Sequence, residues 1–367
     1  MKLKMKGYAT SSKRPPGFSE IQDKKMTPQQ EKQIADWNSR QSDEIQIRLI
    51  ETKDERSVKF SRFCEELSRI APKVRVVREK NESSEASVIQ IGDAVRYHAI
   101  PLDAELEPFL DALGMPGKKH ADIPGHIQNA LDKIDMPVEL RVYISLTCPF
   151  CPATVKQLLP LAFENKLIRI TIADGMLFPE MAQSDNIQSA PTVLLDGRFR
   201  WTGSLELEEL LEIMTNRDPS DLSAASLERM ILEGDAFRLA ELMLDKEKIF
   251  PAFPDVLAHN LFSVRLGAMA AMEEIAEQNI KLAATVAEPL WEHFQGQGDE
   301  IKGDILHILG ESGNADIIPR LKTISDGSYN AEIREAATEA IEKILIITDS
   351  GEAPAPALRQ IRANVQV

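Results

Sequence analysis

Short runs of alternating hydrophobic and polar residues fill the chain between residues 44 and 100, with a helix-period run between them. Alternation is typical of half-buried strands, whereas apolar residues three and four positions apart indicate an amphipathic helix. Gly92 and Asp93 separate two such runs, as expected of a β-hairpin. The pattern predicts a helix from residue 27, strands at 44–52, 73–79, 86–92 and 94–100, and helices at 55–71 and 102–113.

The same order of elements recurs between residues 123 and 215. It predicts strands at 138–146 and 167–174, a hairpin at 191–203, and helices at 123–134, 148–165, 176–186 and 205–214. Self-similarity over roughly 90 residues indicates that one supersecondary plan occurs twice. We therefore expect two α/β units in tandem, residues 27–115 and residues 116–215.

From residue 227 to residue 347 the apolar positions recur only at helical spacing. The segments 263–277, 300–313 and 332–345 share a phase, and each opens with a β-branched aliphatic residue followed by a base. A regular repeat of helix pairs is typical of an α-solenoid, and this pattern resembles HEAT repeats. The predicted fold is thus α/β followed by an all-α array, with a linker at 216–226 and flexible tails at 1–26 and 348–367.

The composition of the chain bears on which partners it can bind and on where in the cell it is found. The formal net charge of −15 opposes binding to phosphate backbones, so we predict no nucleic-acid partner. The chain has no long apolar run and its first residues lack the apolar core of a signal peptide, which predicts no membrane segment and a cytoplasmic protein. Three cysteines are too few for a disulfide scaffold, and a close pair in a reducing compartment favours redox or metal chemistry.

The candidate chemistry lies in the stretch TCPFC, which places Cys148 and Cys151 between a predicted strand and a predicted helix. At the first turn of a helix, the macrodipole and the free backbone N–H groups stabilise a thiolate. We therefore predict that Cys148 is the nucleophile and that Cys151, one turn further on, is more buried and resolves the mixed disulfide. Pro149 and Phe150, which lie between them, are predicted to contact the substrate.

Two other roles for the cysteine pair stay open. Half of a zinc site would need two further ligands, and an iron–sulfur cluster could bridge two chains. A second Cys-x-x-Cys is absent from the sequence, and the histidines show no paired ligand spacing. Cys64 lies on the apolar side of the helix predicted at 55–71, so we predict that it is a buried core thiol.

The segments YISLTCPFCP and SAPTVLLDGR together resemble the N-terminal domain of the alkyl hydroperoxide reductase flavoprotein subunit. They also resemble protein disulfide oxidoreductases of the double-glutaredoxin type. The resemblance implies a thioredoxin-like fold in which Pro191 is cis, faces the cysteines and, with Ala190, presents its backbone to the substrate. The segment IPLDAELEPFLDAL maps an acidic proton acceptor onto Glu105, although an acid near a helix start is also favourable on the surface.

The chain departs from that family in two respects. A glycine-rich GxGxxG dinucleotide fingerprint is absent from the sequence, and the helical array stands where flavin and nucleotide domains would follow. The resemblance therefore implies that the chain binds no cofactor and takes electrons from a separate thioredoxin-reductase-like flavoprotein. The stretch ETKDERS, residues 51–57, occupies the cysteine slot of the first unit, which predicts that this unit is structural or a docking surface.

The favoured hypothesis is a cytoplasmic thiol–disulfide oxidoreductase that acts on protein disulfides, including those of peroxiredoxin-type partners. The array would then dock a partner, because acidic solenoids bind proteins more often than nucleic acid. The alternative is a redox-sensing adaptor, whose HEAT-like array binds a partner under control of the Cys148–Cys151 disulfide. The intact Cys-x-x-Cys and the hairpin proline favour the first hypothesis, because turnover requires both.

Overall fold

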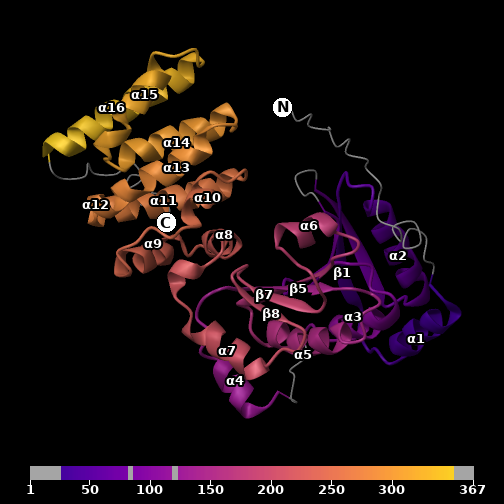
Figure 1. Ribbon diagram of the computed structural model, residues 1–367. Coiled ribbons are helices and arrows are strands. Elements are labelled where there is room, and N and C mark those ends of the chain that lie inside the picture. The colour runs from indigo at the N-terminus through magenta and orange to yellow at the C-terminus, as the bar shows by residue number, and fades with distance from the viewer. Residues whose placement is uncertain (1–25, 82–85, 118–122, 351–367) are drawn as a thin grey trace, which may run out of the picture.

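The computed structural model describes residues 26–81, 86–117 and 123–350 (Figure 1). Its strands are β1 Ile45–Glu51, β2 Val74–Lys80, β3 Val88–Ile91, β4 Val95–His98, β5 Val138–Ile144, β6 Ile168–Asp174, β7 Thr192–Leu195 and β8 Phe199–Thr202. The helices that accompany them are α1 Pro28–Ser39, α2 Ser57–Ile70, α3 Leu106–Leu113, α4 Gly125–Leu131, α5 Cys151–Glu164, α6 Pro179–Ser184 and α7 Leu207–Asn216. The strands and helices predicted up to residue 215 are therefore confirmed, with ends that differ by a few residues.

Within the described residues, the strands form a single eight-stranded sheet of order β2-β1-β3-β4-β6-β5-β7-β8. β1 pairs parallel with β2 and antiparallel with β3, and β5 pairs in the same way with β6 and β7. The same arrangement thus occurs in a first half of the sheet, made of β1 to β4, and in a second half, made of β5 to β8. The halves are joined because β4 pairs parallel with β6, from His98 beside Ala173 back to Val95 beside Ile170.

Side chains of alternate residues divide between the two faces of the sheet, as the pleat requires. In β5, Val142 belongs to the large core that α3 and α5 cover. Its neighbour Tyr143 faces the other way, into a smaller apolar cluster with Ala173 and Leu194. α6 lies on this second face, opposite α3 and α5 (Figure 1). The sheet is therefore covered on both faces beside the cysteine loop.

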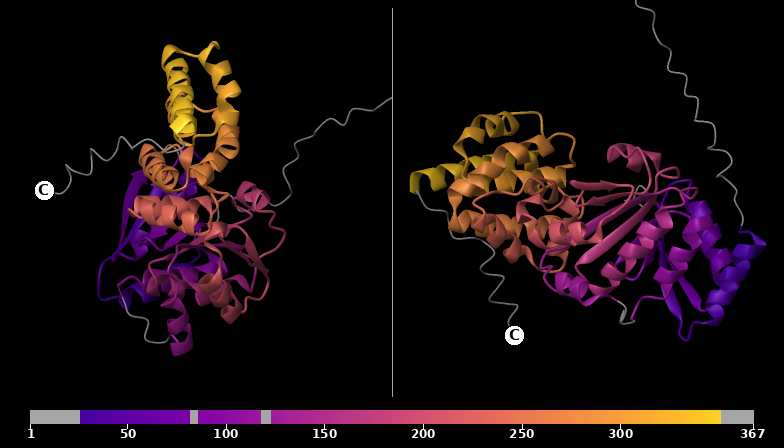
Figure 2. Two further views of the ribbon diagram at one scale, coloured as in Figure 1. Left: turned by 90° about the vertical axis from the view of Figure 1, so that its left-hand side faces the viewer. Right: turned by 60° about the horizontal axis from the view of Figure 1, so that its bottom comes forward.

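The described residues after α7 form helices that have a hydrophobic core of their own. Figure 2 shows these helices stacked away from the sheet, with α14 packed against both α11 and α16. None of the described helices is both long and apolar enough to cross a bilayer. The helices are α8 Ala224–Leu232, α9 Ala236–Asp245, α10 Phe253–Leu257, α11 Phe262–Gln278, α12 Ile280–Ala283, α13 Ala287–Phe294, α14 Asp299–Glu311, α15 Ile318–Ser325 and α16 Ala331–Ser350.

The predicted tails differ in how far the structure reaches them. α16 continues to Ser350, so the first residues of the tail expected from residue 348 are helical. Residues 1–25 and 351–367, the remainder of the two predicted tails, lie outside the described residues. At the other end, the Thr27 side chain accepts from the Gln30 backbone N–H, and the Gln30 side chain accepts from the Thr27 backbone N–H, which completes a capping box at the start of α1.

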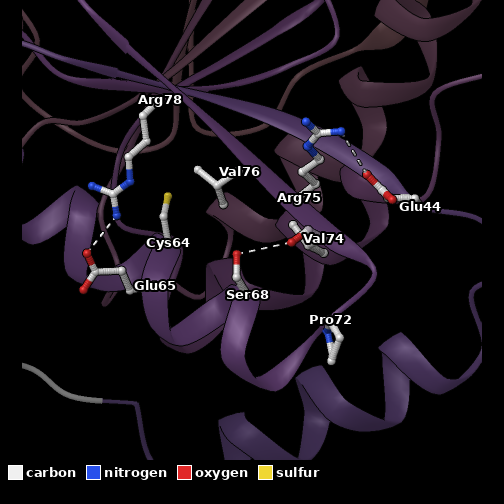
Figure 3. Close-up of a pocket in the computed structure, with 9 residues that line it drawn as sticks. All are labelled: Glu44, Cys64, Glu65, Ser68, Pro72, Val74, Arg75, Val76 and Arg78. Carbon is white, nitrogen blue, oxygen red and sulfur yellow. Dashed lines mark hydrogen bonds and ion pairs between the residues drawn. The ribbon is translucent and has the colours of Figure 1, made fainter.

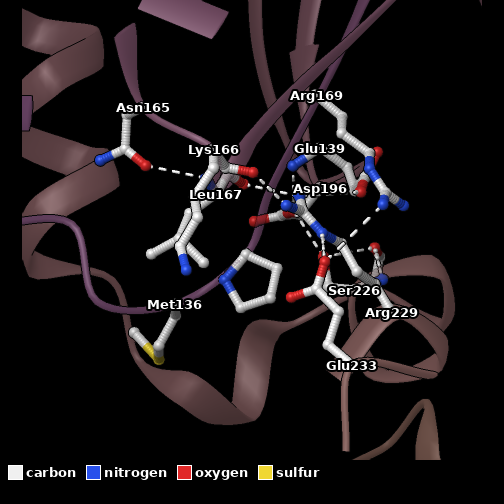
Figure 4. A network of polar contacts seen from close by, with 12 residues as sticks. Met136, Glu139, Asn165, Lys166, Leu167, Arg169, Asp196, Ser226, Arg229 and Glu233 are labelled. Carbon is white, nitrogen blue, oxygen red and sulfur yellow. Dashed lines mark hydrogen bonds and ion pairs between the residues drawn. The ribbon is translucent and has the colours of Figure 1, made fainter. Parts of the chain in front are cut away.

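The segment predicted as a linker, residues 216–226, takes part in a buried polar contact between the sheet and the helices (Figure 4). Arg217 pairs with Asp196, and their side chains are only 1% and 2% exposed. The Asp196 carboxylate also accepts from the Glu139 backbone N–H and from the Ser226 hydroxyl, each at 3.2 Å. Asp196 stands before Gly197 at the turn between β7 and β8, a pair of residues typical of a hairpin turn. Its carboxylate in addition ties the sheet to the helical region.

Arg229, on α8, makes a second contact between the same two parts (Figure 4). Its guanidinium donates to the Leu167 carbonyl oxygen at 2.8 Å and to the Glu233 carboxylate at 2.9 Å. Leu167 directly precedes β6, so this contact lies at the end of the sheet where β5 and β6 begin. The helical region therefore contacts the sheet at the end where β5 and β6 begin. The cysteine loop lies at the opposite end, after the last residue of β5.

Candidate functional site

The cysteine pair lies where β5 ends and α5 begins. α5 starts at Cys151 and its N-cap is Phe150, so Cys148 precedes the helix and does not occupy its first turn. The Cys148 backbone N–H donates to the Ser145 carbonyl at 2.9 Å and closes a turn there. Cys148 is partly exposed and Cys151 is buried, and both are free thiols. This difference in exposure is the one expected of an attacking and a resolving cysteine.

The Ala190–Pro191 peptide bond is cis, and Pro191 directly precedes β7. The Cys148 thiol donates to the carbonyl oxygen of Ala190, with Sγ and O 3.4 Å apart. β7 brings the proline there because Thr192 lies opposite Tyr143, near the end of β5. The structure therefore places Ala190 and Pro191 against the cysteine loop, as the resemblance implies.

The two residues between the cysteines face solvent. Pro149 is exposed, and the Phe150 ring is 70% exposed although it is large and apolar. An exposed aromatic ring beside a reactive thiol is a surface that a partner can cover. Cys151, by contrast, is shielded. Burial, then the hydrogen bond with Cys148, raises the pKa of its thiol well above the ordinary value, so Cys151 keeps its proton in the resting state.

Glu105 comes from the first half of the sheet unit, at the end of the short helix Asp103–Glu105, but it lies near Cys151 of the second half. Its side chain is 0% exposed, and neither carboxylate oxygen has a hydrogen-bond partner among the described residues. Burial, then the charge of Asp174, raises its pKa to about 7. Its charge in turn raises the pKa of Cys151, so the two groups are neighbours. A surface position for Glu105, which the sequence left open, is excluded.

Asp174 is a site residue that sequence reasoning missed. It is the last residue of β6, lies opposite Ile144 and is 1% exposed. Its carboxylate accepts from the Met176 backbone N–H at 2.9 Å, and burial raises its pKa. The signal in the sequence is an acid directly after the apolar run IRITIA. Two acids with raised pKa values thus lie at the edge of the sheet that carries the cysteines.

The corresponding slot of the first half holds hydroxyl groups. Ser57 begins α2 and its Oγ contacts the Ser87 Oγ, while Thr52 lies 3.3 Å from the same Ser87 oxygen. Ser87 directly precedes β3, as Pro191 precedes β7. A hollow of about 520 Å³ opens here, between α2 and Lys80. This slot carries no thiol, in contrast to the slot of the second half.

The third cysteine lies at the floor of a separate shallow hollow of about 620 Å³ between α2 and β2 (Figure 3). Arg78 and Glu65 form an ion pair of 2.8 Å at its rim. Cys64 itself is 1% exposed, and burial raises the pKa of its thiol to about 12. The predicted core thiol is confirmed. Cys64 remains protonated and is a poor nucleophile near neutral pH.

A group of residues that could ligate a metal lies in the helical region, away from the cysteine pair. Glu273, His307 and Glu311 place one ligand atom each within 4.8 Å of the others, and Lys343 contacts Glu311 as a cation. Across the described parts of the chain, the cysteine pair is not joined by a third histidine, cysteine or acidic ligand in such a group. A tetrahedral zinc site needs four ligands. The pair thus offers two sulfur ligands only.

Comparisons with known proteins bear on the same residues. The family described as "Thioredoxin domain" matches residues 138–215, so this part of the chain is a thioredoxin-like domain. The chain is 29% identical over 174 residues to an NADH dehydrogenase of Bacillus subtilis, which covers 47% of this chain and 34% of that protein. It is 31% identical over 121 residues to the AhpF protein of alkyl hydroperoxide reductase in Pseudomonas aeruginosa, which covers 32% of this chain and 22% of that protein.

Solved structures that resemble part of the chain were found as well. The NTD_N/C domain of the reductase AhpF from Enterococcus faecalis has a TM-score of 0.46 and 20% identity, covering 52% of this chain and 100% of that one. A protein disulfide oxidoreductase from Aeropyrum pernix has a TM-score of 0.49 and 15% identity, covering 55% and 97%. The family model and the reductase relative confirm the resemblance that the segments around the cysteines indicate, and the resemblance to HEAT repeats stays a prediction. The chain spans about a third or less of the two curated relatives named, at 34% and 22% of their lengths.

Proposed function

We propose that Cys148 and Cys151 form the active site of a thiol–disulfide oxidoreductase that acts on protein disulfides. One observation carries the proposal. The partly exposed Cys148 thiol lies 3.4 Å from the Ala190 carbonyl, beside the cis peptide of Pro191 and in front of the buried Cys151. A substrate segment that pairs with the Ala190 backbone would lie against Cys148, with Pro149 and Phe150 exposed on the adjoining surface.

The proposed reaction has two displacement steps. The Cys148 thiolate attacks one sulfur of the substrate disulfide, the substrate S–S bond breaks, and the released sulfur leaves as a thiolate that takes up a proton. Cys151 then loses its proton and attacks the Cys148 sulfur. This step breaks the mixed disulfide, releases the second substrate thiol and leaves a Cys148–Cys151 disulfide. Two electrons pass from the dithiol to the substrate.

Glu105 is proposed to take the proton that Cys151 gives up. Its carboxylate is buried near Cys151, has no hydrogen-bond partner there, and has a pKa raised to about 7. An acceptor whose pKa lies near ambient pH both takes and returns a proton readily. The protonated form prevails below that pKa, so the resolving step should slow as the pH falls through about 7.

The donor and the other parts of the chain are assigned by the same proposal. A thioredoxin-reductase-like flavoprotein would return two electrons to the disulfide, and a cytoplasmic setting would keep the dithiol reduced. Residues 27–115 would be a second thioredoxin-like unit without redox cysteines, supported by the repeated strand order. Residues 227–347 would be a HEAT-like array that docks a protein, supported by its excess of 24 acidic over 12 basic residues between Asn216 and Leu345. Peroxiredoxin-type disulfides are the proposed substrates.

The test compares cysteine variants in the full chain. C148S should lose reduction of insulin disulfides, whereas C151S should accumulate a mixed disulfide on Cys148 that mass spectrometry detects. C64S is the matched control, because Cys64 is buried in the first half, and it should keep full activity. A C148S protein that still reduces insulin would refute the proposal.

The adaptor alternative has less support. The helical region contacts the sheet through Arg217 and Arg229, at the edge opposite the cysteine loop. A disulfide switch would therefore have to act across the length of the strands. Equal affinity of the oxidised and reduced protein for a captured partner would rule the adaptor out.

A further inference from the structure

Arg56 of the first half reaches across to the second half. It is the residue before α2, in the slot where the second half carries its cysteines. The guanidinium donates to the Leu177 carbonyl oxygen at 2.8 Å and pairs with the Glu180 carboxylate at 2.6 Å. Both of these partners belong to the second half, in the loop that follows β6 and in α6.

The guanidinium is itself held from two other sides. Its Nε lies 2.8 and 2.9 Å from the two carboxylate oxygens of Asp54, and its Cζ lies 4.1 Å from the centre of the buried Phe178 ring. The Arg56 side chain is only 18% exposed. A planar guanidinium with fixed donors on several sides fixes the geometry of its partners.

Two of the residues that Arg56 contacts, Leu177 and Phe178, lie in the β6–α6 loop, residues 175–178. The Gly175 N–H in this loop donates to the Ile144 carbonyl at 3.1 Å. Ile144 is the last residue of β5, and the loop with Cys148 begins after it. The two loops therefore leave the sheet from neighbouring strands at the same edge. Met176, between the fixed Gly175 and Leu177, is 52% exposed.

The contact is not required to join the two halves. The backbones of β4 and β6 already pair from Val95 to His98, and this pairing does not involve the Arg56 side chain. Arg56 adds a local constraint on a loop that has a long exposed apolar side chain. Such constraints lower the entropy that a flexible surface loses when it is covered by a partner.

We propose that Arg56 is a positioning residue. It holds the β6–α6 loop so that Met176 forms one wall of the surface that binds the substrate disulfide, beside Phe150. The occupant is the extended segment of a protein that carries the disulfide to be reduced. This inference rests on the proposed function and assigns part of its substrate recognition to the half that has no cysteines. Small disulfides, which are too short to reach Met176, would not depend on Arg56.

The test measures two substrates and three arginine variants in the full chain. R56Q should raise the KM for a protein disulfide about tenfold, equivalent to ~1.4 kcal/mol, and leave kcat unchanged. Its reduction of bis(2-hydroxyethyl) disulfide should stay at the wild-type rate. R56K, which keeps the charge and one donor direction, should recover part of the KM. R69Q is the matched control, because Arg69 lies on α2 and makes an exposed ion pair with Glu31 of α1. It should leave the KM and kcat for both substrates unchanged.

A double-mutant cycle and hydrogen exchange make the assignment specific. M176A should raise the same KM, and R56Q should add little to it, because both changes act on one wall. The amides of Met176, Leu177 and Phe178 should exchange faster in R56Q. Fully additive KM effects, equal losses on both disulfides, or unchanged exchange would overturn the inference. Inactive wild-type protein would refute the proposed function alone, and hydrogen exchange would still decide whether Arg56 holds the loop.

Discussion

Replacing Glu105 by glutamine removes the buried carboxyl group and keeps its shape. Burial, then the charge of Asp174, raises the pKa of this group from an ordinary 4.5 to about 7. Between these two values the folded protein holds a proton that the unfolded chain has released. The free energy of unfolding therefore falls as the pH rises through this window, because the folded state binds more protons than the unfolded state.

The size of the effect follows from the same shift. At about 1.4 kcal/mol per pKa unit, a pKa raised from 4.5 to about 7 corresponds to a loss of ~3 kcal/mol once the group is fully ionised. Glutamine cannot ionise, so E105Q escapes this loss. We expect E105Q and wild type to be similar in stability near pH 4, and E105Q to be more stable by ~3 kcal/mol near pH 8.

Urea unfolding of both proteins with reduced cysteines, at a series of pH values, measures this difference directly. E107Q is the matched control, because the Glu107 side chain is 66% exposed and pairs with Lys156. A gap between E105Q and wild type that stays constant from pH 4 to pH 8 would refute the argument that burial holds a proton on Glu105. In turnover, E105Q should accumulate the mixed disulfide on Cys148, since the acceptor for the Cys151 proton is gone.

Three further outcomes follow from the packing. G310A should destabilise the protein by ~1–3 kcal/mol in urea unfolding, because its Cβ would lie 3.0 Å from the Ala340 backbone. G303A is the control on the same helix. Its Cβ would have no atom of another residue within 4 Å, so this change should stabilise the protein by ~0.5–1 kcal/mol. D196N should cost ~3–5 kcal/mol, because it leaves a buried guanidinium without its counter-ion, and a cost below ~1 kcal/mol would contradict the buried pair. Iodoacetamide on the folded protein should alkylate Cys148 and spare Cys64, as peptide mass mapping would reveal; equal labelling would contradict the burial of Cys64.

Local patterns predicted the elements well where one face of each element is buried. The alternation in β5 and the helical spacing in α5 each specify a side that packs on the core, so both were predicted. The juxtaposition of Cys148 with Ala190 was expected from the resemblance alone, and the structure shows its cause, because the start of β7 pairs with the end of β5. Cys148 stands ahead of its helix because the chain first turns at Ser145, and spacing alone does not reveal that turn.

Long-range polar contacts were the part that the sequence could not predict. Asp196 has the sequence signature of a turn, and nothing local indicates that its carboxylate meets Arg217. Asp174 and Glu105 stand far apart in the chain, so their electrostatic coupling depends on the meeting of the two halves. That meeting is the pairing of β4 with β6, and hydrophobic periodicity is the same for an edge strand as for an interior one.

The pairing of β4 with β6 also protects the redox half from association with other chains. β6 is mostly buried, and its Ile170 and Ile172 lie beside Val95 and Tyr97 of the first half. If the first half were cut away, one side of β6 would present a row of unpaired N–H and C=O groups, which is a template for β-pairing between molecules. The half without cysteines therefore acts as a covalently attached edge cap, and it keeps the thioredoxin-like domain from growing its sheet into a neighbour.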